Sequence, residues 1–344
     1  MEVLYIGHYE EGSTSRMRGE LLKQILQPAN FTIADINVPL LATSRVFRSL
    51  GWRYKRGPLI RNINQYIIRQ VGDKWNYDLV WIDKGVFVDP AIVKRLRGHS
   101  HKLVHFTPDP AFTYHRSKLF YKALPLYDHC VTTKSYEVEE YKKNGARDII
   151  TCTQGYDPSV HKPYYKQEHK EGVVFIGHYE KDREELLLQL FGAGFDIVLA
   201  GIGWRKFAKK YKYKNRLHYL GDGVFGEQYA RTISKGLVGL GLLSKIVPEL
   251  HTTRTFEIPA CHTMLATERN AETEAVFGED DVLFFDDAEE LIGKIRTALS
   301  EKIYARFIAE NGYKKVVRGR YDYRSILETI IKKIYSKETV SELQ

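Results

Sequence analysis

Two glutamates near residue 250, Glu249 and Glu257, stand eight positions apart in the segment 249–262. If the chain is helical from Thr253 onward, Glu257 lies in the first turns of that helix and Glu249 in the loop before it. One carboxylate can then accept hydrogen bonds from the paired hydroxyls of a ribose and the other from a sugar, while Arg254 at the helix start neutralises a phosphate. The helix dipole alone also favours acids at a helix start, so this structural explanation stays open.

A second candidate site follows the apolar run at 173–176. The loop 177–183 leads into an expected helix at 184–190, whose first N–H groups and positive dipole end suit a pyrophosphate. The loop is neither a G-x-G-x-x-G fingerprint nor a P-loop. For each glycine, a tight turn is an equally good explanation. The phosphate-binding candidates are Gly177, His178, Lys181 and Arg183, together with Gly201 and Gly203 in a second glycine turn.

In the first half of the chain, the segment 105–110 follows an expected strand and contains two prolines. His105 or Asp109 can contact a substrate at that strand end, and a polar turn explains the same residues equally well. Gly7 and His8 occupy the corresponding loop after the first strand of this half. His8 and the matching histidine of the second half occupy equivalent positions of two similar folds, which explains both without a catalytic role.

Basic residues gather in two stretches, the first of which, from Ile36 to Gly72, contains no acid. Its cations alternate with apolar residues, which suits an anionic membrane or a lipid-phosphate acceptor as well as it suits a solvated helix face. For the second stretch the solvated face is the favoured explanation. The first stretch comprises Arg45, Arg48, Arg53, Lys55, Arg56, Arg61 and Arg69 with Leu41, Val46, Phe47, Leu50, Trp52 and Tyr54; the second comprises Arg205, Lys206, Lys209, Lys210, Lys212, Lys214 and Arg216 with Trp204, Phe207, Tyr211 and Tyr213.

An internal repeat indicates which elements position these residues. The segment 3–10 recurs at 173–180, 170 positions later. A single repeat in 344 residues excludes a solenoid and favours two domains of similar topology, each opening with a buried strand and a glycine turn. We expect an N-terminal domain at 1–160, a polar linker at 155–171, a second domain at 171–320, and a C-terminal helix with a frayed tail at 321–344.

Strand-like runs alternate with helical periodicity in both halves, which argues for an α/β fold of parallel, doubly wound sheets. Two such sheets facing one another create a cleft at their strand ends, where ligands bind. The expected strands are 31–36, 78–82, 103–106, 129–132 and 148–152 in the first half, and 196–200, 217–220, 237–242, 264–266 and 282–285 in the second. The expected helices of the first half are 16–26, 60–71, 91–96 and 135–143.

The composition limits the function classes. Apolar residues make up 43% and charged residues 28%, which is ordinary globular usage. The net charge of +9 attracts phosphates of some kind. Cys130, Cys152 and Cys261 lie far apart, which excludes a disulfide scaffold or a cysteine-based zinc site and fits a reducing cytoplasm. The chain has no apolar run long enough to span a bilayer, and its start does not read as a signal peptide.

Several motifs together resemble the group 1 (family 4-like) glycosyltransferases, and most of all their CgeB-like spore maturation branch. The resemblance covers residues 77–325. In the second half it is carried by Arg254-x-Phe256-Glu257-Ile258-Pro259-Ala260-Cys261, Phe277-Gly278-Glu279-Asp280, Val282-Leu283-Phe284-Phe285 and Glu289-Glu290-Leu291. In the first half it is carried by the segments 77–85 and 106–110, Tyr127-Asp128, Glu140-Tyr141, Asn144-Gly145-Ala146 and Gly155-Tyr156-Asp157-Pro158.

This resemblance implies the GT-B architecture, in which two Rossmann-like domains face a cleft and bind the acceptor mostly on the first domain and the nucleotide-sugar donor mostly on the second. By the Glu-x7-Glu element of the relatives, Glu249 faces the donor sugar and Glu257 the ribose. The chain departs from the relatives at Leu250-His251-Thr252, where they have a Gly-Phe-Gly-like stretch, and at Ala260-Cys261-His262, where they have Ala-Cys-Gly. Both departures bear on the sugar and phosphate contacts.

We therefore expect a hexosyltransferase-type glycosyltransferase that moves a sugar from a nucleotide-diphosphate sugar to a glycan, lipid-linked or protein acceptor of the cell envelope. Without an Asp-x-Asp motif we expect no metal and no cofactor, and relatives of this type favour retention of configuration. We expect a cytoplasmic location, peripheral at the inner face of the membrane. The candidate catalytic residues are Glu249, Asp109, His105 and Arg254; the donor-binding residues are the phosphate-binding candidates above with Arg254 and Glu257; and the acceptor or membrane side has Gly7, His8, Arg45, Arg48, Trp52 and Arg53.

Two other functions remain as alternatives. A nucleotide-sugar epimerase or hydrolase of the same fold would need no acceptor. A basic nucleic-acid-binding protein would bind DNA or RNA with a steep salt dependence, but the sequence contains no recognition helix, RNP motif or zinc finger to support it. We therefore expect no nucleic-acid partner.

Overall fold

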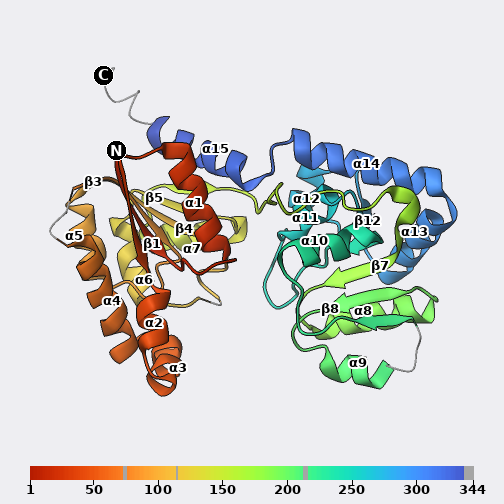
Figure 1. Ribbon diagram of the computed structural model, residues 1–344, viewed down its shortest axis with the longest axis horizontal. Helices are drawn as coiled ribbons and strands as arrows, with labels where there is room; N and C mark the ends of the chain where they lie inside the picture. The colour runs from red at the N-terminus through yellow and green to blue at the C-terminus, as the bar shows by residue number, and fades with distance from the viewer. Residues whose placement is uncertain (73–75, 114, 212–215, 337–344) are drawn as a thin grey trace. The chain divides into compact units, whose positions relative to one another are not determined.

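The computed structural model describes residues 1–72, 76–113, 115–211 and 216–336 (Figure 1). The chain divides into two units, of which the first comprises Met1–Cys152 and the segment 324–336, and the second Thr153–Tyr323. The sequence suggested positions 160 and 321 for these two boundaries. Residues 155–171, expected as a linker, lie inside the second unit, where the N–H of Tyr156 donates to the carbonyl of Tyr321.

The first unit is built on a six-stranded sheet with the order β2-β1-β3-β4-β5-β6, and every neighbouring pair is parallel. Three helices, α2, α3 and α4, follow one another between β2 and β3. Besides the first strand, the sequence predicted five strands in this half, and the structure contains all five. The elements are β1 (Glu2–Gly7), α1 (Thr14–Leu26), β2 (Asn30–Asp35), α2 (Asn37–Ala42), α3 (Arg45–Tyr54), α4 (Pro58–Val71), β3 (Tyr77–Asp83), α5 (Pro90–Arg97), β4 (Ser100–Thr107), α6 (Lys118–Ala123), β5 (His129–Thr132), α7 (Val138–Lys143), β6 (Ile149–Thr151) and α15 (Tyr323–Ser336).

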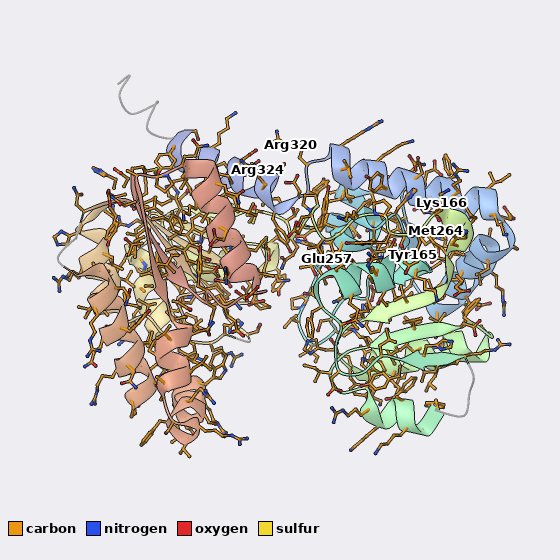
Figure 2. All side chains as sticks on the ribbon, in the orientation of Figure 1. Tyr165, Lys166, Glu257, Met264, Arg320 and Arg324 are labelled. Atoms are coloured by element: carbon orange, nitrogen blue, oxygen red, sulfur yellow. The ribbon has the colours of Figure 1, made fainter. Side chains whose placement is uncertain are left out.

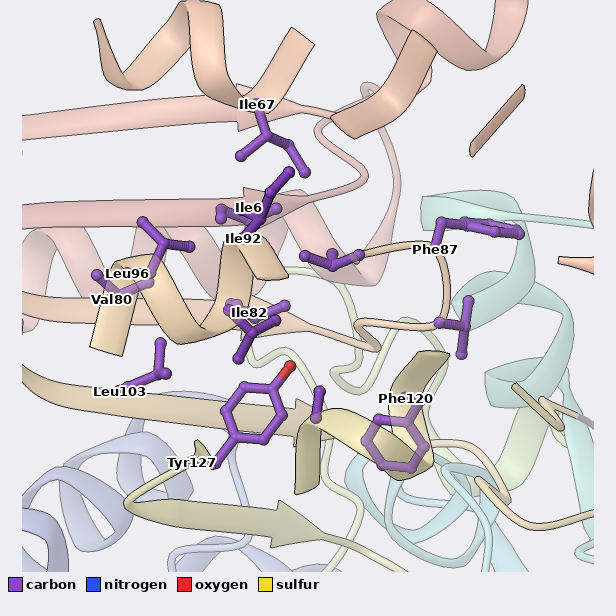
Figure 3. Packing of buried hydrophobic residues seen from close by; sticks show 14 of the residues in the cluster. Ile6, Ile67, Val80, Ile82, Phe87, Ile92, Leu96, Leu103, Phe120 and Tyr127 are labelled. Carbon is purple, nitrogen blue, oxygen red and sulfur yellow. The ribbon is translucent and has the colours of Figure 1, made fainter. Parts of the chain in front are cut away.

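Side chains alternate across this sheet, because successive residues of a strand point to opposite faces. Leu4 and Ile6 of β1 join a core cluster with α4, α5 and α6, part of which Figure 3 shows. Val3 and Tyr5 join a second cluster on the other face, to which α1 and α15 contribute. Strands covered on both faces are continuous apolar runs, which is why β1 and β3 were predicted correctly.

The second unit has a six-stranded parallel sheet with the order β12-β11-β10-β7-β8-β9. Its first strand repeats the alternation of β1, since Val173 and Phe175 face one core cluster and Val174 and Ile176 the other. The five later strands expected in this half are also present. The elements are β7 (Glu171–Ile176), α8 (Lys181–Gly192), β8 (Ile197–Ala200), α9 (Arg205–Tyr211), β9 (Leu217–Tyr219), α10 (Gly226–Lys235), β10 (Gly236–Leu240), α11 (Arg254–Ala260), β11 (Met264–Glu268), α12 (Ala271–Val276), β12 (Leu283–Phe285), α13 (Ala288–Ser300) and α14 (Lys302–Arg318).

The two sheets are therefore related but not identical. β7 has two strands, β8 and β9, on one side, whereas β1 has only β2 on the corresponding side. The predicted pair of doubly wound parallel sheets is confirmed. Throughout the described part of the chain, no helix combines the length and the apolar character needed to cross a membrane.

Candidate functional site

The carboxyl ends of β7 and β10 lie side by side in the middle of the second sheet, because these two strands pair directly. The strands after β7 continue the sheet in one direction and those after β10 in the other, so the strand order reverses here. In open α/β sheets, ligands bind beyond the strand ends at such a reversal. The loops 177–180 and 241–253, which leave these strands, therefore form the candidate site of this unit.

Two arginines meet at this site. Arg183 in the first turn of α8 and Arg254 at the start of α11 both donate through Nη2 to the carbonyl of Leu242, at 3.4 and 3.1 Å. Arg183 also donates to the carbonyl of His178 at 2.9 Å and lies 3.0 Å from the carboxylate of Glu180, with its side chain only 6% exposed. Burial and the positive charge of Arg254 lower the pKa of Arg183. Among the residues that the structure describes, the buried Nε–H groups of both arginines have no hydrogen-bond partner, so the pair has donors to spare for an anion such as phosphate.

Three carboxylates hold the loop beside these arginines. The backbone N–H groups of residues 243–245 each donate to a different glutamate: Glu268 (3.1 Å), Glu249 (3.2 Å) and Glu180 (3.0 Å), in that order. Glu268 ends β11 and Glu180 precedes α8, so the loop is tied to its neighbours on both sides. Glu249 lies in this loop, as predicted, and its carboxylate is engaged by the loop backbone.

Glu257 lies in the first turn of α11, as predicted, and is 9% exposed (Figure 2). Its Oε2 accepts hydrogen bonds from the Tyr229 hydroxyl at 2.6 Å and from Thr253 Oγ1 at 3.0 Å. Its Oε1 lies 3.6 Å from Nε2 of His161. Burial and the charge of Glu257 raise the pKa of Tyr229 well above its usual range, so the phenol stays a donor. Lone pairs of Oε1 remain for a further donor such as a hydroxyl group.

The predicted glycines bring the loops after β7 and β8 into contact. Gly201 has a φ of +140°, and a Cβ there would lie 1.9 Å from the carbonyl oxygen of Gly177. Gly203 has a φ of +94°, and a Cβ there would lie 2.7 Å from Cβ of Tyr179. Close backbone packing accounts for both glycines, as the tight-turn explanation proposed. Their contact with a ligand stays a prediction.

Helix α8 begins at Lys181, three residues earlier than expected, so Lys181 and Arg183 lie in its first turn rather than in the loop before it. The Lys181 side chain is 83% exposed, and its Nζ lies 3.7 Å from Glu185. The His178 side chain is also exposed, and only its carbonyl contacts Arg183. A surface pocket of about 670 Å³ adjoins this corner, and Tyr179, Gly203 and Arg205 are among the residues that line it.

In the first unit, the structure places His105 inside the core rather than at a substrate-accessible surface. The ring is fully buried, within 4.6 Å of Phe120 and 5.4 Å of Tyr127 between centroids. Its Nε2 bonds the carbonyl of Lys84 at 3.2 Å, and burial lowers the pKa of the ring to about 4. A buried neutral ring that packs against aromatic side chains is a structural group, so this position argues against the catalytic role expected for His105.

Asp109 lies at the end of β4 in a partly exposed ion cluster. Its Oδ2 is 2.6 Å from Nζ of Lys84 and 3.3 Å from Nε2 of His115. Although burial opposes ionisation, these two partners hold the pKa of Asp109 well below its usual range. The carboxylate therefore stays charged and carries no proton that it could donate, which suits a binding role better than general acid catalysis.

The loop after β1 has its own fixed contacts. A Cβ on Gly7 would lie 2.9 Å from Cβ of Asp83, so this glycine allows β1 and β3 to approach. His8 Nδ1 is 2.6 Å from the side-chain oxygen of Asn37. Next to Gly7, Asp83 is fully buried in an ion pair with Arg18 at 2.8 Å, which sequence reasoning missed.

Sequence reasoning also missed His251, although it noted the departure of Leu250-His251-Thr252 from the relatives. The Nδ1 atom of His251 is 2.5 Å from a carboxylate oxygen of Glu272, and its Nε2 accepts the N–H of Gln154 at 3.0 Å. The ring is therefore the neutral tautomer with its proton on Nδ1. It fixes the 241–253 loop to α12 and to the start of the second unit.

The predicted basic stretches lie mainly on two helices. Arg45, Arg48, Trp52 and Arg53 are on α3, and the Lys-rich stretch of the second half is on α9. Lys212, Tyr213 and Lys214 of that stretch lie outside the described residues. Within the described ranges, no group of three or more His, Cys, Asp or Glu side chains is arranged to hold a metal ion. The expected independence of metals stays a prediction.

Comparisons with known proteins agree with the fold. Residues 182–332 match a family described as "Glycosyl transferase-like". The solved structure of sucrose-phosphate synthase from Thermosynechococcus elongatus has a TM-score of 0.68 at 13% identity, over 99% of this chain and 100% of that one. HepE from Anabaena, solved with UDP, has a TM-score of 0.66 at 14% identity, over 98% and 100%. A trehalose 6-phosphate synthase from Burkholderia multivorans has a TM-score of 0.62 at 11% identity, over 99% of each chain.

None of the curated proteins matches the sequence significantly. The structural neighbours have the GT-B fold, so the predicted GT-B architecture is confirmed. Arg183, Arg254 and Glu257 lie within the matched segment. The similarity to this family therefore includes the part of the second unit that carries the arginine pair. The likeness to the CgeB-like branch stays a prediction.

Proposed function

We propose that this protein is a glycosyltransferase that takes its sugar from a nucleotide-diphosphate donor bound to the second unit. The arginine pair, Arg183 and Arg254, carries the proposal, because two cations with spare N–H donors lie where the strand order reverses. Glu257 lies one helical turn beyond Arg254, at a distance suited to a nucleoside attached to the same diphosphate. The match over 182–332 supports this function, as do the UDP and UDP-glucose complexes of HepE.

The chemistry of glycosyl transfer explains why these residue types are needed. As the bond to the sugar breaks, the sugar becomes oxocarbenium-like and negative charge builds on the leaving diphosphate. Fixed cations that face the diphosphate stabilise this charge without reorganising. We assign this role to Arg183 and Arg254. Glu257 then binds the ribose hydroxyls, and the donor sugar lies near Glu249.

Finer features of the function are part of the same proposal. We propose transfer of a hexose with retention and without a metal, to a glycan, lipid-linked or protein acceptor of the cell envelope, in the cytoplasm. We assign the acceptor to the first unit, near Asp109 and the loop that contains Gly7 and His8, because these residues lie at the carboxyl ends of its parallel strands.

Donor turnover by the full chain tests the proposal. The protein is incubated with a panel of nucleotide sugars, and nucleotide release is measured with and without candidate acceptors. We expect Arg254→Gln to lower kcat/KM by roughly 10²–10³-fold, the usual cost of removing one fixed donor to a developing anion. The matched control is Arg296→Gln on the exposed face of α13, which should leave kcat/KM unchanged.

Two results would contradict the proposal. If no nucleotide sugar is turned over and no nucleotide raises the melting temperature, the second unit is not a donor site. If a sugar is turned over equally fast without any acceptor, the protein is an epimerase or hydrolase rather than a transferase.

A further inference from the structure

The surface of α2 and α3 in the first unit is unusually apolar. Seven large apolar side chains between residues 38 and 54 are exposed by 45–67%. On α3, Val46, Leu50 and Tyr54 recur at every fourth position and therefore share one face of the helix. The seven residues, called here the α2–α3 surface, are Val38, Leu41, Val46, Phe47, Leu50, Trp52 and Tyr54.

Packing in the unit uses only the edge of the α2–α3 surface, where the Trp52 ring lies 4.9 Å from that of the buried Phe87 between centroids. The only buried residue of α3 is Gly51. A Cβ at Gly51 would lie 2.5 Å from Cβ of Leu59 on α4, so the two helices approach through the glycine and not through the large side chains. The other large apolar side chains of α3, Val46, Phe47, Leu50 and Tyr54, thus remain outside the core that α4 joins.

The charged residues within the segment that carries the α2–α3 surface are all positive. Residues 36–72 contain no acid. Within the described ranges, none of five nearby arginines has an ion-pair partner. These arginines are Arg45, Arg48, Arg53, Arg56 and Arg61. Unpaired cations that flank exposed apolar and aromatic side chains are complementary to a surface with phosphate headgroups above an apolar layer.

We propose that the α2–α3 surface docks the protein on an anionic lipid bilayer. Val46, Phe47 and Leu50 enter the boundary between headgroups and acyl chains, and Trp52 and Tyr54 lie at headgroup depth, where amphipathic rings are favoured. The arginines bind the lipid phosphates. Nucleic acid would satisfy the arginines but would leave the apolar side chains in water. The proposal does not depend on glycosyl transfer.

Sedimentation of the full chain with lipid vesicles tests this proposal. We expect binding to vesicles of phosphatidylcholine with about 30% phosphatidylglycerol, little binding to phosphatidylcholine alone, and weaker binding at high salt because exposed charges are screened. The double variant Phe47→Ser/Leu50→Ser should bind at least roughly tenfold more weakly, since it removes the inserted side chains. The triple variant Arg45→Gln/Arg48→Gln/Arg53→Gln should lose the preference for anionic vesicles.

The chain offers a matched control on α14, where Ile303 and Phe307 are also exposed. Phe307 and Phe47 are both 49% exposed, so Ile303→Ser/Phe307→Ser removes similar apolar surface elsewhere. This control variant should bind vesicles like the unaltered protein. Because the replaced side chains are exposed, or half-buried in the case of Arg48, the variants should keep their melting temperature, which verifies that they are folded.

The proposal is overturned if the unaltered protein does not bind anionic vesicles, or if Phe47→Ser/Leu50→Ser binds them as well as the control variant does. If the protein fails to bind vesicles but is a dimer that this double variant converts to a monomer, the α2–α3 surface is an interface between two copies instead.

Discussion

At the residue scale, Glu257 differs from an ordinary acid at a helix start because its carboxylate is already fixed. Tyr229 and Thr253 hold Oε2, and the side chain is nearly buried. An acid that only served the helix dipole would need neither hydroxyl. The carboxylate is therefore oriented before any ligand arrives, so the Glu257 side chain loses less conformational entropy when a ribose binds.

This orientation predicts how Glu257→Gln changes nucleotide binding. The amide keeps the shape but loses the charge, so a nucleoside diphosphate should bind roughly 10–100-fold more weakly, as expected for a hydrogen bond to a charged group worth about 1.5–3 kcal/mol. Titration calorimetry should show that the unaltered protein prefers the ribonucleotide to its 2′,3′-dideoxy form and that Glu257→Gln does not. The control Glu227→Gln neutralises an exposed glutamate of α10 and should keep the preference; an undiminished preference in Glu257→Gln would assign the ribose elsewhere.

His105 predicts a pH dependence of stability rather than of catalysis. Its folded pKa of about 4 lies below the usual value of 6.5, so between these two pH values the unfolded chain binds a proton that the folded chain does not. Stability therefore falls as the pH drops from 6.5 to 4, by at most about 3 kcal/mol from this residue.

Replacing His105 by Phe should remove this contribution. The difference in unfolding free energy between His105→Phe and the unaltered protein, measured in urea, should shift in favour of the variant as the pH falls from 7 to 4.5. The control Tyr127→Phe changes the neighbouring ring, 5.4 Å away, without removing the imidazole, and should leave the pH dependence unchanged. Parallel curves for His105→Phe and the unaltered protein would contradict the assignment.

Some residues of the candidate site could be predicted from the sequence, and others could not. Glu257 and Arg254 belong to one short helix, so their type and spacing were enough. The contact of His251 with Gln154 joins positions 97 residues apart, and only the folded chain brings them together. His105 was misjudged because its position at a strand end gives no sign of which face its side chain takes.

At the element scale, the loops after β7 and β8 are held together by backbone contact instead of side chains. Gly201 has a positive φ and faces the carbonyl of Gly177. We therefore expect Gly201→Ala to lower the free energy of unfolding by more than an alanine at a positive φ does where space is available. Gly221 provides the comparison, since it has a φ of +100° and a Cβ built there would meet no heavy atom of the described residues within 4 Å.

Urea unfolding should show that Gly221→Ala costs about 1–2 kcal/mol for the backbone conformation. Gly201→Ala should cost at least about 2 kcal/mol more, because the loops must separate to admit the methyl group. It should also weaken nucleotide binding, since Gly177 leads into the arginine pair. Equal costs for the two variants would mean that the contact between the loops is unimportant.

The central strands, such as β1, β3 and β7, were predictable because each is an apolar run covered on both faces. Helix α3 was not predicted as a helix, because its large apolar side chains are exposed and its single buried residue is a glycine. Patterns of burial reveal elements that face a core. They do not reveal a helix such as α3, whose large apolar side chains are exposed and do not follow the core.

At the scale of the whole molecule, the chain leaves the first unit at Cys152 and returns to it with α15. Leu327, Ile330 and Ile334 of this helix are buried against Leu22 of α1 and the sheet. Figure 1 shows α15 beside α1. The amphipathic pattern of the C-terminal segment predicts a helix but does not tell which unit it covers. The first unit is thus completed by residues that follow the second in the sequence.

This arrangement predicts which unit a change in α15 destabilises. Ile330→Ala removes a fully buried side chain from the first unit and should cost about 2–4 kcal/mol. In scanning calorimetry, a nucleoside diphosphate should raise the transition of the second unit, because it binds that unit only when folded. Ile330→Ala should lower the other transition and leave the nucleotide-dependent shift intact, whereas Lys332→Ala on the exposed face of the same helix should change neither. If Ile330→Ala lowers the transition that the nucleotide raises, the two units unfold as one, and the C-terminal helix then contributes to the stability of the donor site as well as to that of the first sheet.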